Sequence, residues 1–396
     1  MSRIIAPYFS PQQEDYMSQR PFKTWDIFCR VVDNFGDIGV CWRLARQLAV
    51  EYPFQVRLWV DEISALTKIW PNAVHQEQQE LEHVDVRIWH ENFDAEDAAD
   101  VVIEAFACEL PATYLAAMKR RATAPHWFNL EYLSAEDWVE GCHGLLSPHP
   151  SLGLKKVFFF PGFTLKTGGL LKEASLIKDR DTFLSDIAKH TNLLSSLGVS
   201  RPENALVISL FGYENGTVSS LLDSWVDSSQ AVLCLVPEGK ILGDINRYFG
   251  KQLCSGDEII KGALTIKVIP FLSQSTYDQL LWACDLNFVR GEDSFARAQW
   301  AQRPFVWHIY PQEDDIHLAK LDAFLNLYLD QAPAELAPAI AELWRDWNQA
   351  KDVRKSWEAC VSQLKNWQTH SQNWCQHLNS LGDLASNMVQ FCQKTL

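Results

Sequence analysis

The fold is decided by residues 25–52, WDIFCRVVDNFGDIGVCWRLARQLAVEY. The apolar run WDIFCRVV (25–32) predicts a buried strand, and CWRLARQLAVEY (41–52) predicts an amphipathic helix. The turn between them, DNFGDIGV (33–40), carries Asp33 and Asp37 at the start of that helix. A helix N-terminus usually attracts phosphate, which these two carboxylates would repel. The turn therefore predicts a cationic or protic ligand.

The same alternation of strand and helix continues along the chain, which favours parallel sheets covered on both faces. Further strands are expected at QVRLWVD (55–61), VDVRIWH (84–90), ADVVIEAF (99–106) and HWFNLEYL (126–133). A second series is expected at ALVISLFGY (205–213), AVLCLVP (231–237), LTIKVIPFL (264–272), DLNFVRGEDS (285–294) and RPFVWHIYP (303–311). Two Rossmann-like α/β domains facing each other match the GT-B architecture of glycosyltransferases.

The domain limits follow from composition and from the pattern of the strands. We expect an N-terminal extension (1–24), a first Rossmann-like domain (25–170), a charged connecting segment (171–203), a second Rossmann-like domain (204–374) and a C-terminal helix that packs toward the first domain (375–396). After about residue 330 the chain is helical and rich in tryptophan, at Trp344, Trp347, Trp357, Trp367 and Trp374. Tryptophans at helical spacing are typical of a helix-packing core rather than of a ligand cage.

Charge and composition exclude several classes of function. The 396 residues carry a net charge of −15 and no basic block, which argues against nucleic acid and against an anionic membrane as partners. The 10 cysteines are scattered singly and indicate reduced thiols, with no metal site. The sequence has no signal-peptide core and no apolar run long enough to span a membrane, so we expect a cytoplasmic protein. The D-x-D triplet at 179–181 is interpreted as a solvated helical face or a helix cap, with a metal ligand as the alternative.

The segment RGEDS (290–294) is the second chemically rich stretch. No dinucleotide glycine motif and no phosphate-loop motif occurs in the chain. Arg290 is expected to end a strand at the crevice where α/β sheets bind nucleotides, and Glu292, Asp293 and Ser294 to occupy the first turn of the next helix. These residues could simply cap the helix, or Arg290 and the free helix N–H groups could clamp a diphosphate.

Aromatic residues stand near other expected strand ends. Phe211, Tyr213 and Phe271 could sandwich a flat base, and Gln274 could hydrogen-bond it. Each aromatic taken alone fits a hydrophobic core better, and its placement at a strand end makes a base-binding role an equal alternative.

Three segments, WDIFCRVVDNFGDIGVCWRLARQLA, NLEYLSAE (129–136) and RGEDSFARAQWA (290–301), resemble the EarP family of bacterial protein-arginine rhamnosyltransferases. The likeness runs from Trp25 to the C-terminus. It implies an inverting, metal-independent GT-B enzyme that needs no cofactor. The donor would be dTDP-β-L-rhamnose, and the acceptor an arginine of elongation factor P, which the sugar activates for ribosomes stalled at polyproline.

The resemblance also implies site residues. The catalytic carboxylates would be Asp37, Asp33 and Glu292, and the turn that supports them would contain Asn34, Phe35, Gly36 and Gly39. Donor binding would fall to Phe211, Tyr213, Phe271, Gln274, Arg290, Asp293, Ser294 and Tyr310, with Tyr277 as an alternative to Phe271 in stacking. A guanidinium is a poor nucleophile while protonated, so it must be held and must lose a proton. We assign Asp37 as the base, with Asp33 and Glu292 either orienting the guanidinium or supporting positive charge at the anomeric carbon. We expect Gly36 and Gly39 to admit the acceptor backbone or the sugar.

Other functions remain open from the residues themselves. A GT-B transferase could act on another acceptor, such as a glycan or a lipid. A non-catalytic protein could bind a nucleotide sugar, but three carboxylates would not help a protein that only binds a negatively charged diphosphate. A dehydrogenase is disfavoured because the dinucleotide glycine pattern is missing.

Overall fold

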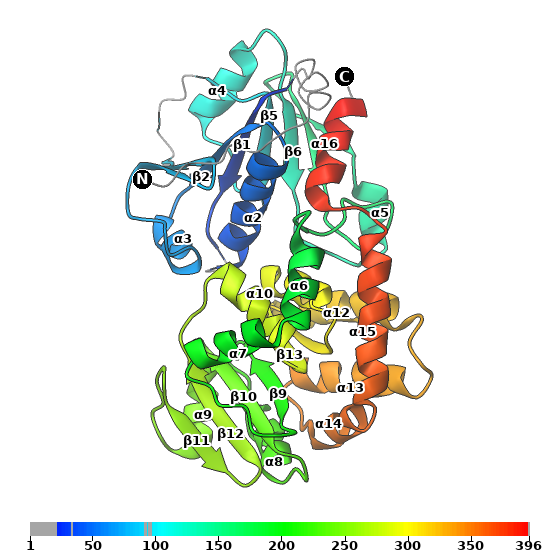
Figure 1. Ribbon diagram of the computed structural model, residues 1–396. Coiled ribbons are helices and arrows are strands. Elements are labelled where there is room, and N and C mark those ends of the chain that lie inside the picture. The colour runs from blue at the N-terminus through cyan, green and yellow to red at the C-terminus, as the bar shows by residue number, and fades with distance from the viewer. Residues whose placement is uncertain (1–21, 33–34, 91–92, 94–96, 395–396) are drawn as a thin grey trace.

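The computed structural model describes residues 22–32, 35–90, 93 and 97–394. Asp33, Asn34 and most of the predicted N-terminal extension lie outside the described residues. The described chain forms two α/β units, one above the other in Figure 1, with a run of helices along one side.

The first unit is built on a mostly parallel sheet. Within the described residues its strand order is β3-β4-β2-β1-β5-β6-β8-β7, and only the β3–β4 and β7–β8 pairs are antiparallel. The strands are β1 (Thr24–Cys29), β2 (Gln55–Val60), β3 (Gln78–Leu81), β4 (Val84–Ile88), β5 (Val101–Ala105), β6 (His126–Leu130), β7 (Leu146–Pro148) and β8 (Lys155–Phe159). Its helices are α2 (Gly36–Glu51), α3 (Ile63–Ile69), α4 (Ala112–Arg120) and α5 (Trp138–Cys142).

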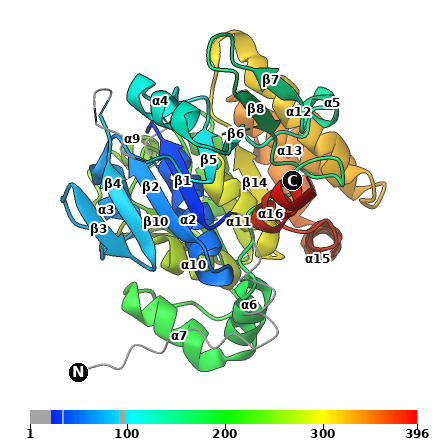
Figure 2. The same cartoon turned by 90° about the horizontal axis from the view of Figure 1, so that it is seen from above.

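Strand β1 shows why this sheet is covered on both faces. Trp25 and Ile27 face a core that includes α2, whereas Phe28 faces a second core that includes Tyr114 of α4. Figure 2 shows α4 and α2 on opposite sides of the strands. A strand buried on both faces reads as a continuous apolar run, which is the pattern that predicted it.

The second unit repeats the plan with a six-stranded sheet in the order β11-β12-β10-β9-β13-β14, counted over the described residues. Only the β11–β12 pair is antiparallel. The strands are β9 (Leu206–Leu210), β10 (Val232–Pro237), β11 (Glu258–Lys261), β12 (Leu264–Ile269), β13 (Leu286–Arg290) and β14 (Phe305–His308). The helices between and before them are α6 (Leu176–Ser185), α7 (Ile187–Ser196), α8 (Val218–Val226), α9 (Leu242–Phe249), α10 (Gln274–Ala283) and α11 (Asp293–Trp300).

The chain ends in helices that run from the second unit back to the first. They are α12 (Ile316–Leu329, after the short 3-10 turn Glu313–Asp315), α13 (Leu336–Asn348), α14 (Arg354–Val361), α15 (Leu364–Asn379) and α16 (Leu384–Lys394). The five tryptophans of this region are at most 8% exposed and belong to the core of the second unit, so their assignment as core is confirmed. Helix α16 packs in the core of the first unit.

The predicted domain limits stay predictions, with one difference to report at residue 374. Helix α15 passes through that point without a break and ends at Asn379, where a turn at Ser380 and Leu381 follows.

In both sheets the strand order reverses around a central strand, β1 in the first and β9 in the second. Ligands of open α/β sheets bind outside the carboxyl ends of the strands at such points. Residues that follow β1, β9, β12 and β13 line one shared cavity, so the two carboxyl edges face each other across it.

Candidate active site

Two adjoining cavities lie between the units, and both are open to solvent. The first, of about 650 Å³, is called the aromatic pocket here, and the second, of about 990 Å³, the acidic pocket. Gly36, Gly291 and Glu292 line both, so the cavities meet at the first turns of α2 and α11. A ligand in one pocket would lie beside a ligand in the other.

The aromatic pocket gathers the residues that the sequence proposed for donor binding, with one exception. Its lining includes Phe211, Tyr213, Phe271, Gln274, Arg290, Asp293 and Ser294. Tyr310 is the exception, because it lines the acidic pocket and packs edge-on against Tyr213, with the ring centroids 5.4 Å apart. Tyr310 therefore lies at the boundary between the two pockets, and its role in donor binding stays a prediction.

Arg290 ends β13 as predicted and reaches into the aromatic pocket. Its guanidinium carbon lies 4.4 Å from the ring centroid of Phe211 and 4.8 Å from that of Tyr213. Cation–π contact holds the planar group in one orientation. Its Nη1 is buried and has no hydrogen-bond partner among the described residues. A buried charged donor without a partner favours an anionic ligand.

Ser294 does not cap α11, which corrects the capping alternative. Its hydroxyl donates to the carbonyl of Arg290 and accepts from the Arg290 N–H at 3.2 Å. The residue at the cap position is Glu292, whose side chain makes no capping bond. Ser294 thus fixes the strand end that carries Arg290, and the first N–H groups of α11 have no side-chain cap.

The stacking alternatives remain open in the structure. The ring of Phe271 packs against Phe35 at 4.8 Å between centroids, and the ring of Tyr277 packs against Phe211 at 5.5 Å. All four line the aromatic pocket. Burial raises the pKa of the Tyr277 phenol well above its ordinary value, so this side chain stays neutral.

Gln274 and Gly39 make contacts between the units that the sequence did not predict. The Gln274 Nε2 donates to the carbonyl of Gly39 at 3.0 Å and to Asp293 Oδ2 at 3.2 Å, so this amide already joins the two units. Its Oε1 is buried and has no partner among the described residues, which leaves one acceptor for a ligand. A Cβ on Gly39 would lie 3.2 Å from that Nε2. Gly39 therefore allows the close approach of α10, and its predicted role toward an acceptor or a sugar stays a prediction.

The acidic pocket contains Asp37 in the first turn of α2. This carboxylate is only 2% exposed and accepts hydrogen bonds from the Val32 N–H at 2.9 Å and from the Tyr132 hydroxyl at 3.3 Å. The Tyr132 ring stacks on Phe106, with centroids 4.4 Å apart. The carboxylate is held in place at the wall of an open cavity, which suits a group that accepts a proton from a ligand.

Glu292 enters the same pocket from the second unit. Its Oε2 accepts from the Leu133 N–H at 3.0 Å, and burial together with the charges of Asp37 and Asp293 raises its pKa from 4.5 to about 8, with Lys320 opposing the shift. Two carboxylates from two units thus line one cavity. A cation entering it would compensate both.

Sequence reasoning missed several residues of the acidic pocket, chiefly Tyr132 and Lys320. Tyr132 follows β6 closely, so its position after a parallel strand could have revealed it. Lys320 lies on α12, outside any strand end, and no local pattern marks it. The role of Asp33 stays a prediction, since the residue lies outside the described part of the chain.

Three absences hold for the described residues. No group of three or more His, Cys, Asp or Glu side chains there is arranged to hold a metal ion. Each of the ten cysteines is free, and most are buried. None of the described helices combines the length and the apolar character needed to cross a membrane.

Comparison with known proteins places this site in a family. The family model described as Elongation-Factor P (EF-P) rhamnosyltransferase EarP matches residues 25–393. A protein-arginine rhamnosyltransferase of Pseudomonas putida is 49% identical over 375 residues, which are 94% of this chain and 99% of that protein. One from Shewanella oneidensis is 42% identical over 391 residues, covering 94% and 98% of the two chains.

Solved structures agree. A structure described as "Structural basis for EarP-mediated arginine glycosylation of translation elongation factor EF-P" matches with a TM-score of 0.68 and 35% identity, over 94% of this chain and 99% of that one. A glycosyltransferase from Rickettsia africae matches with a TM-score of 0.52 at 9% identity, over 94% and 98%, which shows a shared fold alone. The GT-B architecture predicted from the sequence is confirmed. The chain belongs to the EarP family of protein-arginine rhamnosyltransferases, which are glycosyltransferases.

Proposed function

We propose that this chain transfers L-rhamnose from dTDP-β-L-rhamnose to an arginine side chain of elongation factor P, with inversion at the sugar and without a metal ion. The observation that carries the proposal is the junction of the two pockets at Glu292. One pocket offers a guanidinium and aromatic faces to a nucleoside diphosphate, and the other offers carboxylates to a cation. The solved relative names elongation factor EF-P as the protein whose arginine is glycosylated.

The donor fits the aromatic pocket. The thymine would stack among the aromatic side chains, and the free acceptor Oε1 of Gln274 would receive a hydrogen bond from it. The diphosphate would bind Arg290 and the uncapped N–H groups at the start of α11. These positive groups stabilise the leaving group, which is the support for a reaction without a metal.

The acceptor arginine fits the acidic pocket. Its guanidinium would bind between Asp37 and Glu292, and Asp37 would accept the proton as an arginine nitrogen attacks the anomeric carbon. The nitrogen–carbon bond forms while the bond from that carbon to the diphosphate oxygen breaks, and dTDP leaves with the electron pair. A single displacement from the opposite side inverts the sugar. The first unit would receive the acceptor and the second the donor, in the cytoplasm where translation factors act.

Intact-mass measurement of elongation factor P after incubation with this chain and dTDP-β-L-rhamnose tests the proposal. One added deoxyhexose, placed on arginine by fragmentation, is the expected result, and it should persist in a chelator such as EDTA. An unmodified factor together with binding of the nucleotide sugar would indicate another acceptor or a non-catalytic binding protein. Loss of transfer in EDTA, restored by a divalent cation, would refute the metal-free mechanism.

A further inference from the structure

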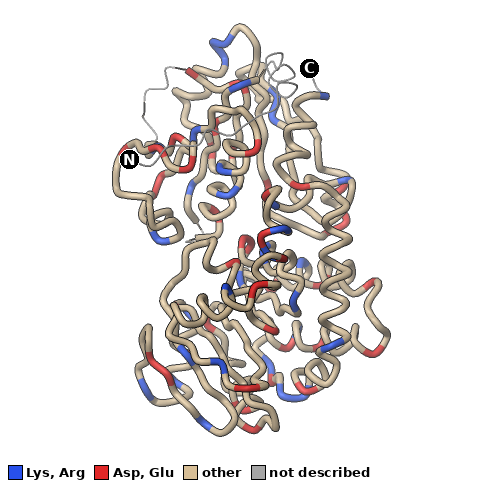
Figure 3. The backbone as a smooth tube through the Cα atoms, in the orientation of Figure 1, with Lys and Arg blue, Asp and Glu red and all other residues tan. Residues whose placement is uncertain are grey.

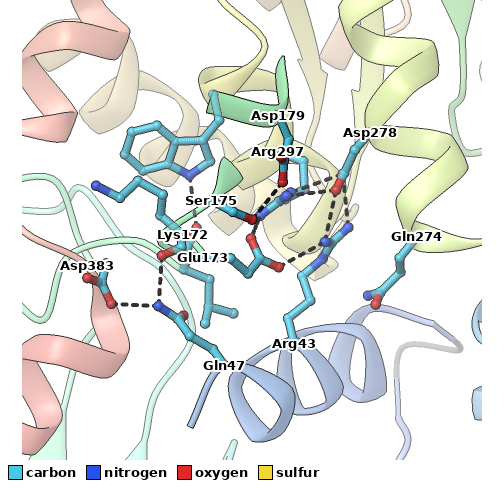
Figure 4. Close-up of polar contacts among 12 residues, drawn as sticks. Arg43, Gln47, Lys172, Glu173, Ser175, Asp179, Gln274, Asp278, Arg297 and Asp383 are labelled. Carbon is cyan, nitrogen blue, oxygen red and sulfur yellow. Dashed lines mark hydrogen bonds and ion pairs between the residues drawn. The ribbon is translucent and has the colours of Figure 1, made fainter. Parts of the chain in front are cut away.

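Arg43 lies on α2 at the junction of the two units, and it is 2% exposed. Its two terminal nitrogens donate to both oxygens of Asp278 on α10, at 3.0 and 3.1 Å. Its Nε donates to Asp293 Oδ1 at 2.7 Å. Figure 4 shows this guanidinium pointing from α2 toward the second unit. One side chain of the first unit thus binds two carboxylates of the second.

A second arginine completes the group, which we call the junction cluster: Arg43, Glu173, Asp278, Asp293 and Arg297. Arg297 of α11 donates to Asp278 at 3.0 and 2.7 Å and to Glu173 at 2.6 Å. Figure 3 shows acidic and basic residues side by side where the units meet. Asp278 therefore receives a two-nitrogen fork from each arginine.

The cluster is held in one arrangement by its charges. Burial alone would lower the pKa of Arg43, but Asp278, Asp293 and Glu173 together raise it above its ordinary value. The guanidinium therefore stays charged, and removing one partner leaves an uncompensated buried charge. Arginine satisfies this geometry because its two terminal nitrogens bind one carboxylate and its Nε binds another, whereas lysine has a single nitrogen.

The cluster lies directly behind the candidate active site. Asp37 stands six positions before Arg43 on α2, a rise of roughly 9 Å along the helix axis. Asp293 is the residue next to Glu292 at the start of α11. The Arg43–Asp293 contact therefore fixes the first turn of α2 relative to the first turn of α11, and with them the two carboxylates of the acidic pocket.

Asp293 also lines the aromatic pocket, where its Oδ2 accepts from Gln274. Its negative charge would repel a diphosphate there unless a cation compensated it. Arg43 is that cation, since its Nε binds the other carboxylate oxygen.

We propose that Arg43 is a positioning residue for the transfer: it holds α2 and α11 at the separation that places Asp37 and Glu292 in one pocket, and it partly offsets the negative charge of Asp293 beside the diphosphate. This inference rests on the proposed function, and it deepens that function by dividing the work of one side chain into a geometric part and an electrostatic part.

The two parts are separated by substitution. Arg43→Lys keeps the charge and loses the fork, so thymidine diphosphate affinity by calorimetry should stay within about threefold while kcat falls about tenfold or more. Arg43→Gln loses both, so affinity should also fall about fivefold or more. Adding Asp293→Asn to Arg43→Gln should restore the affinity but not kcat.

The matched control is Arg57→Lys. Arg57 donates two hydrogen bonds to the buried Asp26, at 2.5 and 2.6 Å, within the first sheet. Its kcat, per folded molecule by circular dichroism, should stay within about twofold.

The proposal is overturned if folded Arg43→Lys keeps the wild-type kcat, or if Asp293→Asn restores no affinity in the Arg43→Gln chain. If Arg43→Gln does not fold, Arg43→Lys alone tests the proposal: its kcat must fall while its affinity for thymidine diphosphate stays near that of the wild type. Amide hydrogen exchange, measured without ligand, tests the positioning role of Arg43 independently of the proposed function. Even if the wild type leaves elongation factor P unmodified, the Arg43→Lys chain must lose protection of its backbone amides against exchange in α2 and α11. The control Arg57→Lys must instead lose protection in β1 and β2. Equal protection of α2 and α11 in wild type and Arg43→Lys refutes the positioning role.

Discussion

The Glu292 carboxylate accepts a hydrogen bond from the Leu133 N–H at 3.0 Å, although the two residues lie 159 positions apart and in different units. The bond ties the loop after β6 to the start of α11. Because Glu292 also lines both pockets, this contact lies where donor and acceptor would meet. The protonation of Glu292 is therefore coupled to whatever enters the acidic pocket.

Acceptor binding should release a proton from Glu292. Its pKa of about 8 means that the neutral form predominates below that pH, and an arriving guanidinium favours the charged form. Affinity for the arginine-bearing domain of elongation factor P should therefore rise with pH up to about 8 and then level off. Calorimetry in buffers of different ionisation enthalpy measures the proton directly. Glu292→Gln should bind without proton release, and an unchanged release in that variant would assign the proton to another group.

The same raised pKa has a consequence for stability. The folded chain holds the Glu292 proton more tightly than the unfolded chain does, so this stabilisation is complete below pH 4.5 and is lost as pH rises through about 8. The free energy of unfolding of wild type, relative to Glu292→Gln, should therefore decrease between about pH 5 and 9. Urea unfolding at several pH values measures it, and a difference that grows with pH would contradict the shift.

Asp37→Asn should lower kcat about a thousandfold, because the amide cannot accept the proton of the guanidinium. Donor affinity should remain, since Asp37 lines the acidic pocket and not the aromatic one. Asp61→Asn is the control: Asp61 accepts from the Val31 N–H at 2.9 Å and lines neither pocket. Turnover of Asp37→Asn at the wild-type rate would remove Asp37 from the role of base.

Arg290→Ala should weaken thymidine diphosphate binding by about tenfold to a hundredfold, since a charge-assisted contact and an oriented donor are both lost. The affinity of Arg290→Lys should lie between those of the wild type and Arg290→Ala. Lysine keeps the charge but loses the planar contact with Phe211 and Tyr213. Arg247→Ala, at an exposed arginine of α9, should leave affinity unchanged. Calorimetry ranks the variants, and equal affinity of wild type and Arg290→Ala would refute the clamp.

Gly39→Val should reduce turnover, because a Cβ there lies 3.2 Å from the Gln274 Nε2 and 3.4 Å from Asp293 Oδ2. The Gln274 amide and the Asp293 carboxylate must shift, which disturbs hydrogen bonds that join the two units. The control is Gly243→Val in α9, where a Cβ would meet nothing within 4 Å and the cost of valine in a helix is similar. Steady-state rates per folded molecule compare them, and equal rates would show that the junction yields without effect.

The sequence predicts the architecture and most of the aromatic pocket for the same reason. Parallel strands end at one edge of a sheet, so residues after strand ends, such as Phe211 and Arg290, converge whatever their separation along the chain. Periodicity reveals those ends. The functional roles of these residues stay predictions, but their gathering in one cavity is a finding.

The contacts between the units could not be read from local pattern. The sequence predicts Gln274 as a partner of the base, but it does not reveal that the amide nitrogen of this residue binds Gly39 and Asp293. Arg43 reads as an ordinary polar residue of an amphipathic helix, and only the docking of α2 on α10 and α11 makes it a buried partner of two carboxylates. Such roles depend on how two folded units meet, which no pattern within one element encodes.

The chain passes between the units twice, once after β8 and again between α15 and α16, and the two passages lie side by side. Leu170 pairs with Asp383, and the Gln47 amide donates both to the Lys172 carbonyl at 2.8 Å and to Asp383 at 3.0 Å. Two neighbouring tethers oppose twisting of one unit against the other and leave bending about the line through them as the least strained movement. The paired tethers thus mark the expected axis of any such movement.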